Sequence, residues 1–157
     1  MSIKLIALDV DGTLLDDDHR ISDNNIRTIR RAAELGVKIV LCTGRGSMSA
    51  KPVMEELGLE GVMITHNGAS IMDTSGNVLH EYTFNIREVE ELIHYCRKHG
   101  VHYDLNTSTN MIVDQMPADA KKMYDAFLAE PEMVGDVLQV DEPLVKFCMF
   151  GNQDLMD

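Results

Sequence analysis

The feature that most constrains this chain is an apolar run, Ile3 to Leu8, that leads directly into the acidic segment Asp9-Val10-Asp11-Gly12-Thr13. A short apolar run of this kind predicts a buried strand. In an open parallel sheet, ligands bind beyond the carboxyl ends of the strands. We therefore expect Asp9 at such a crevice, with Asp11 two residues on and facing the same way. Gly12 gives the turn its conformational freedom. An ordinary acidic turn has similar composition, but four specified positions rarely match by chance, so the segment favours a functional site.

Alternating helix and strand signals follow this first strand. The expected elements are a helix from its N-cap Ser22 to Gly36, a strand from Val37 to Leu41, a helix from about Ser49 or Pro52 to Leu57, and a strand from Val62 to Thr65. This β-α-β-α-β order predicts a parallel sheet covered by helices, because such crossovers are right-handed. The fold class expected for this part is α/β, a Rossmann-like half-core.

From Ser70 onward the pattern changes to antiparallel signals. The expected elements are a hairpin over residues 71–79, a linker over 82–85, a helix from Asn85 to Gly100, strands over 101–106 and 110–115, a helix over 119–129 that uses Phe127 and Leu128, a strand over 144–150, and a helix N-cap at Asn152. The α-β-β-α-β order predicts an α+β domain with helices on one face of its sheet. We expect two domains, residues 1–84 and 85–157.

Three segments together carry a family resemblance. Leu5 to Leu15 resembles the first motif of the haloacid dehalogenase-like (HAD-like) hydrolase superfamily, and Ile39 to Arg45 resembles its second, a hydrophobic strand that ends in a hydroxyl residue. Thr65-His66-Asn67-Gly68-Ala69 strengthens the match to the Cof-type subgroup, whose class IIB cap domain follows the third core strand. The resemblance covers the whole chain, most weakly in the cap, and implies a HAD-like half-core followed by an α+β cap.

The resemblance assigns the chemistry to the two aspartates. It implies that Asp9 is a nucleophile that forms an aspartyl-phosphate, which splits one difficult displacement into two easier ones. It also implies a Mg²⁺ ion held by a side-chain oxygen of Asp9 and the backbone carbonyl of Asp11, since Mg²⁺ prefers oxygen ligands. The Asp11 carboxyl would then act as general acid and base. A dehalogenase has no alkoxide to protonate, so Asp11 favours phosphate esters.

The remaining candidates are expected to bind phosphate or substrate. The Thr43 hydroxyl and the Gly44 amide are suited to donate hydrogen bonds to phosphoryl oxygens, and Gly12 belongs to the same set. Arg45 is either a bidentate phosphate or substrate contact or a surface salt bridge. Asn67 is either a substrate-side hydrogen-bonding residue or a plain turn residue.

The family's remaining motifs have no match in the sequence. Neither its third motif, a lysine, nor its fourth, a glycine and acid cluster, is found among the 157 residues. We therefore expect an N-terminal fragment without its own phosphatase activity. A truncated core sheet would leave an unpaired edge and promote self-association.

Composition limits the partners. Lys and Arg number 14 against 26 Asp and Glu, and the net charge of −12 argues against nucleic acid and anionic membrane as partners. The apolar runs fall far short of the roughly 20 residues that a membrane span needs. With no signal-peptide pattern and three widely spaced cysteines, the sequence favours the cytoplasm.

Three function classes remain open at this point. The leading one is a Mg²⁺-dependent phosphatase for small phosphorylated metabolites, sugar phosphates above all. A phosphomutase similar to phosphomannomutases, which share the Asp-Xaa-Asp-Gly-Thr start, is the second. A non-catalytic binding module is the third.

Overall fold

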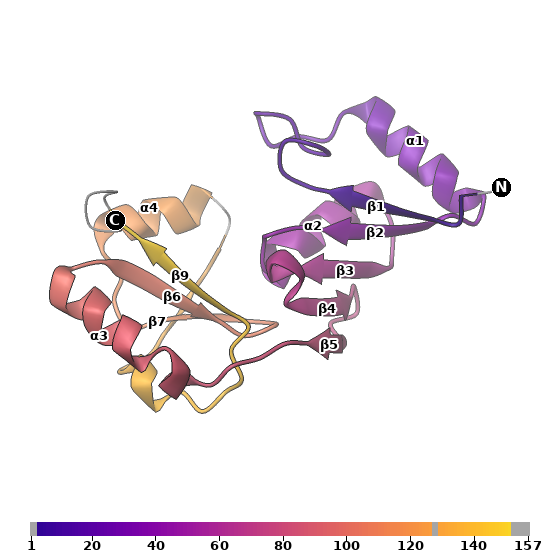
Figure 1. Ribbon diagram of the computed structural model, residues 1–157. Helices are drawn as coiled ribbons and strands as arrows, with labels where there is room; N and C mark the ends of the chain where they lie inside the picture. The colour runs from indigo at the N-terminus through magenta and orange to yellow at the C-terminus, as the bar shows by residue number, and fades with distance from the viewer. Residues whose placement is uncertain (1–2, 127–128, 152–157) are drawn as a thin grey trace. The chain divides into compact units, whose positions relative to one another are not determined.

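The computed structural model describes residues 3–126 and 129–151. The chain divides into two compact units, Met1–Glu81 and Tyr82–Asp157 (Figure 1). The boundary lies three residues before the expected one. Residues 127 and 128, expected on a helix face, and the expected N-cap Asn152 lie outside the described residues.

The first unit is built on one five-stranded sheet. Its strands are β1 (Leu5–Asp9), β2 (Lys38–Cys42), β3 (Val62–Thr65), β4 (Ser70–Asp73) and β5 (Val78–Glu81), and they lie in the order β1-β2-β3-β4-β5. The first three are parallel and the last two join them as an antiparallel hairpin. In the parallel register Asp9 lies opposite Cys42, which in turn lies opposite Ile64. The three parallel strands therefore end at the same edge, and the expected α/β half-core is confirmed.

Two helices cover one face of this sheet. Helix α1 (Asp23–Glu34) begins after Ser22, whose hydroxyl accepts a hydrogen bond from the Asn25 amide at 3.2 Å. Right-handed crossovers between neighbouring parallel strands place α1 and α2 (Ser47–Leu57) on the same side. The Arg30 guanidinium of α1 donates to the Leu57 carbonyl at 2.6 Å, which ties the two helices together.

Helix α2 begins earlier than expected. The sequence placed its start at Ser49 or Pro52, but it starts at Ser47 and Pro52 lies inside it. A proline there costs about 3 kcal/mol. The helix continues because it buries four apolar side chains, each worth about 1.5–3 kcal/mol apart from the smaller alanine: Ala50, Val53, Met54 and Leu57.

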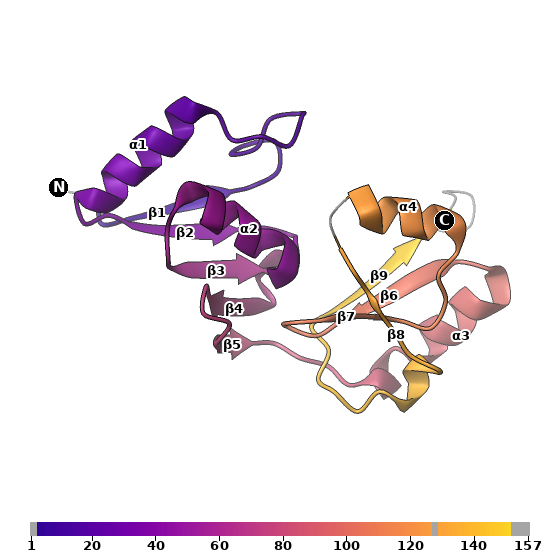
Figure 2. The same cartoon turned by 180° about the vertical axis from the view of Figure 1, so that it is seen from behind.

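The second unit is an α+β fold with a four-stranded sheet. Its elements are η2 (Ile86–Glu88), α3 (Glu90–His99), β6 (His102–Asn106), β7 (Met111–Val113), α4 (Ala118–Ala126), β8 (Glu132–Met133), η3 (Val137–Gln139) and β9 (Lys146–Phe150). The strand order is β8-β7-β6-β9, and Figure 2 shows β8 beside β7. The short β8 and η3 were not expected, because elements of two or three residues leave no periodic pattern.

Two expectations for this unit need correction. The helix expected from Asn85 is interrupted: Asn85 and Glu88 form their capping box on the short turn η2, and α3 starts only at Glu90. The strand expected from Leu144 starts at Lys146, because Leu144 instead pairs with Phe84 in an isolated bridge.

The helices of the second unit lie on opposite faces of its sheet. Tyr103 and Leu105 of β6 pack in one cluster with Ile93 of α3. Asp104, between them in sequence, points the other way and accepts a hydrogen bond from Tyr124 of α4 at 3.0 Å. The expectation of both helices on one face was therefore wrong. None of the helices in the described parts of the chain is long and apolar enough to cross a membrane.

Candidate functional site

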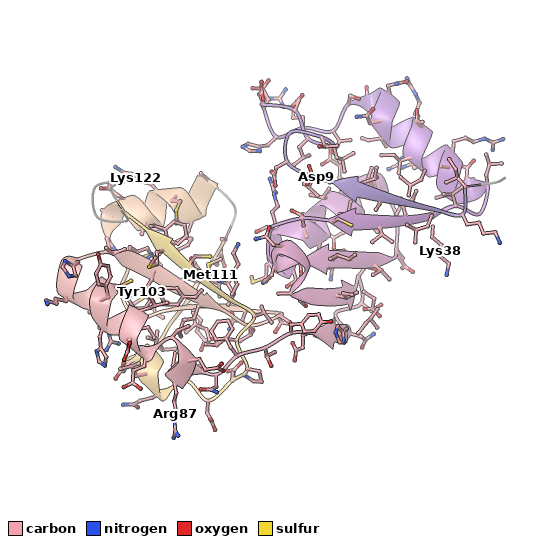
Figure 3. The ribbon with its side chains drawn as sticks, viewed as in Figure 1. Asp9, Lys38, Arg87, Tyr103, Met111 and Lys122 are labelled. Atoms are coloured by element: carbon pink, nitrogen blue, oxygen red, sulfur yellow. The ribbon has the colours of Figure 1, made fainter. Side chains whose placement is uncertain are left out.

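The site begins with Asp9 at the carboxyl end of β1 (Figure 3). Its carboxylate is exposed, and the Thr13 hydroxyl donates a hydrogen bond to Asp9 Oδ2 at 2.8 Å. Thr13 was not predicted from the sequence as a partner of Asp9. A hydroxyl residue four positions after the acid, across a glycine turn, is the signal that could have indicated it. This bond engages one oxygen, Oδ2, of an exposed carboxylate.

The turn after Asp9 is anchored by Val10. Val10 is fully buried, and its carbonyl accepts hydrogen bonds from the Leu14 amide at 3.0 Å and the Leu15 amide at 2.9 Å. Gly12 takes a left-handed conformation with φ of 72°, which explains why a glycine is needed here. Asp9 and Asp11 are thus both exposed on either side of a buried anchor.

Arg45 pairs with Asp11 across 34 residues of sequence. Its Nε lies 3.0 Å from Asp11 Oδ2 and its Nη2 lies 2.6 Å from Asp11 Oδ1, a bidentate contact. The guanidinium holds the pKa of the Asp11 carboxyl below its usual value. Arg45 therefore makes a salt bridge, and its partner is the expected general acid.

Thr43 lies at the end of β2, next to this ion pair. Its side chain is buried, and its hydroxyl oxygen accepts a hydrogen bond from the Arg45 amide at 3.1 Å. Accepting this bond still leaves the hydroxyl proton for donation. The neighbouring Cys42 thiol has its pKa raised by burial and by the charge of Asp9, so it stays protonated near neutral pH.

The segment after β3 closes against the loop after β2. The His66 amide donates to the Arg45 carbonyl at 2.9 Å and the Asn67 amide donates to the Thr43 carbonyl at 3.1 Å. Gly44 lies directly under the Asn67 side chain, since a β carbon on Gly44 would come within 2.6 Å of Asn67 Oδ1. Six of the expected site residues thus gather at one sheet edge around Asp9. His66, whose ring is buried against Gly46, was not among them.

Asp9 offers an exposed carboxylate, an oxygen ligand of the kind that Mg²⁺ takes. Among residues 3–126 and 129–151, no three His, Cys, Asp or Glu side chains gather into a metal cage. Mg²⁺ usually takes only one or two carboxylates and completes its octahedron with water and phosphate oxygens. The exposed Asp9 carboxylate and the backbone carbonyl of Asp11 would supply the one or two protein ligands that such a site needs.

Known proteins resemble both the sequence and the fold. Residues 6–156 match the haloacid dehalogenase-like hydrolase family. The 5-amino-6-(5-phospho-D-ribitylamino)uracil phosphatase YcsE of Bacillus subtilis (strain 168) is 34% identical over 117 residues, which cover 74% of this chain and 47% of that protein. A crystal structure of a haloacid dehalogenase-like hydrolase from Bacteroides thetaiotaomicron superposes with a TM-score of 0.86 at 23% identity, over 99% of this chain and 60% of that one.

A subclass IIB sugar phosphatase of the HAD superfamily superposes with a TM-score of 0.80 at 25% identity, over 98% of this chain and 60% of that chain. The chain spans about half the length of the curated relatives that it matches first, 47%, 49% and 52%. The family match covers nearly every residue, and the sheet order and the Asp9 turn agree with it. The chain belongs to the haloacid dehalogenase-like hydrolase family.

Proposed function

We propose that the protein is a Mg²⁺-dependent phosphatase that hydrolyses small phosphate monoesters, sugar phosphates above all, through an aspartyl-phosphate on Asp9. The observation that carries this proposal is the exposed Asp9 carboxylate at the end of β1, bonded by the Thr13 hydroxyl, with Thr43 following directly on the end of the paired strand β2. The names of the relatives support hydrolysis over the phosphomutase alternative, since two of them are phosphatases of phosphorylated ribityl and sugar compounds.

In the first step Oδ1 of Asp9, the carboxylate oxygen that Thr13 does not bond, attacks phosphorus. The new O–P bond forms as the bond to the leaving alcohol breaks, and Asp11 gives its proton to the departing oxygen. The Thr43 hydroxyl donates a hydrogen bond to a phosphoryl oxygen, where negative charge must be stabilised. A Mg²⁺ ion, when bound by Asp9 and the Asp11 carbonyl, supplies charge neutralisation between carboxylate and phosphate.

In the second step water attacks the phosphorus of the aspartyl-phosphate. Asp11 now takes the water's proton, the O–P bond to Asp9 breaks, and inorganic phosphate leaves with the free enzyme restored. The first step needs a protonated Asp11, whereas Arg45 lowers the pKa of Asp11 and favours its charged form. We infer that Arg45 leaves Asp11 when substrate binds, because the phosphate dianion is a competing bidentate partner for the guanidinium.

The test is the Asp9→Asn variant of the intact protein. An amide is a poor nucleophile of nearly equal size, so phosphate release from an alkyl phosphate should fall at least about 1000-fold, with circular dichroism unchanged. Asp17→Asn, in the exposed loop that follows, is the matched control and should retain activity. Near-normal turnover by Asp9→Asn would exclude the nucleophile.

The metal is tested separately. Activity should require Mg²⁺ and disappear in EDTA, and Ca²⁺ should substitute poorly because its coordination is looser and higher. Undiminished activity in the chelator would exclude the metal's part in the mechanism.

A further inference from the structure

Three consecutive residues after β3 share an unusual backbone conformation. His66, Asn67 and Gly68 have φ of 53°, 58° and 96°. Only glycine adopts this left-handed region freely, and two non-glycine residues in succession are uncommon. Such a conformation persists only where the surrounding structure holds it in place, and it is typical of functional sites.

The contacts show what this segment holds. The amides of His66 and Asn67 bond the carbonyls of Arg45 and Thr43, so the backbone on both sides of Gly44 is fixed. The side chains lie over the two glycines of the same loop. A β carbon added to Gly44 would lie 2.6 Å from the side-chain oxygen Oδ1 of Asn67. A β carbon added to Gly46 would lie 3.1 Å from the His66 ring.

We propose that Asn67 is a positioning residue that holds the Thr43–Arg45 loop, so that the Thr43 hydroxyl meets the phosphoryl group in the reactive geometry. This inference rests on the phosphatase function proposed above. The left-handed backbone directs the backbone N–H of Asn67 at the Thr43 carbonyl. The side chain of Asn67 fills the space above Gly44. Asn67 then acts through the loop and needs no contact with substrate.

The kinetic test uses the close approach of Asn67 and Gly44. Asn67→Gly keeps the left-handed conformation and removes only the side chain. Its kcat should fall by about tenfold to 100-fold with KM unchanged, because a displacement of about 1 Å can cost that much. Gly44→Ala should lower kcat similarly, because the new methyl group would push the side-chain amide of Asn67 aside. The double variant Gly44→Ala/Asn67→Gly should be no slower than Asn67→Gly alone, since the collision is gone.

Amide hydrogen exchange gives a readout independent of turnover. In the intact protein without substrate, the amides of residues 66 and 67 should exchange slowly, faster in Gly44→Ala, and slowly again in the double variant. An Asn67→Gly variant that raises KM alone would make Asn67 a substrate contact and overturn the positioning role. Additive kcat losses, or fast exchange at both amides in the wild type, would overturn it as well.

The same experiments separate this inference from the proposed function. A wild-type protein that releases no phosphate would refute the phosphatase and Asn67's part in catalysis, while slow exchange would still demonstrate the contact between the two loops. An active wild type whose kcat is unaffected in Asn67→Gly would refute the inference and leave the phosphatase intact.

Discussion

Replacing Thr43 by valine removes one hydroxyl from the centre of the site with little change in shape. The hydroxyl oxygen accepts the Arg45 amide at 3.1 Å, and an unpaired buried N–H costs about 1–3 kcal/mol. Because this bond is only partly buried, we expect the lower end, about 1 kcal/mol of unfolding free energy. The catalytic loss should be larger, since removing one donor to a developing oxyanion lowers kcat by about 100-fold to 1000-fold. The variant should therefore be folded and nearly inactive.

The assay is steady-state phosphate release by the intact protein, with urea unfolding of the same preparations. Thr43→Ser is the matched control, because it retains the hydroxyl and loses one methyl group, worth about 0.8 kcal/mol. We expect Thr43→Ser within about tenfold of wild-type kcat and Thr43→Val at least about 100-fold below it. If the valine variant turned over as fast as the serine variant, the hydroxyl would not contact the reacting phosphate.

Three predictions concern stability. In Tyr124→Phe, the buried Asp104 carboxylate loses a 3.0 Å hydrogen bond and His102 loses a 2.8 Å contact. Urea unfolding should therefore show that the free energy of unfolding falls by about 1.5–3 kcal/mol. A decrease below about 0.5 kcal/mol would contradict this hydrogen-bond network. Burial raises the pKa of Asp104 above its ordinary 3.8, so its contribution to stability is complete below pH 3.8 and is lost as the pH rises through the folded-state pKa; Asp104→Asn should flatten that decline, and an unchanged slope would refute the assignment. Arg45 lowers the pKa of Asp11, so the stabilisation from their ion pair is present above pH 3.8 and is lost as the pH falls through the lowered pKa. Since the Asp11 side chain is 48% exposed, Arg45→Met should lower the free energy of unfolding by less than about 1 kcal/mol. Acid unfolding identical to that of the wild type would show that the pair contributes nothing.

Local signals explain which parts of the fold were predictable. The Ser22 cap and the strand Val62–Thr65 were predicted to the residue. Both depend only on residues that are neighbours in the sequence, a capping hydroxyl in one case and a short bounded apolar run in the other. The start of α2 was missed because burial of its apolar face outweighs the proline rule. The placement of α4 opposite α3 depends on the tertiary contact between Tyr124 and Asp104, which no local pattern encodes.

The site shows the same division. The sheet order explains why Asp9, Thr43 and Asn67 gather, since parallel strands end at one edge. A salt bridge of Arg45 was left as one of two alternatives, because the sequence does not say which acid an arginine will meet 34 residues away. The left-handed conformation of His66 was not predicted, because even histidine, which is enriched at positive φ, adopts it in only a small share of cases.

The strand order of the first unit also bears on how the chain folds during synthesis. Each strand from β2 to β5 pairs with the strand made just before it, so no pairing in this sheet waits for a strand of the second unit. Asp9, Thr43 and Asn67 all belong to this unit. The ribosome therefore adds every part of the candidate site to the chain before it reaches Tyr82, and the reactive loops can assemble while the second unit is still being translated.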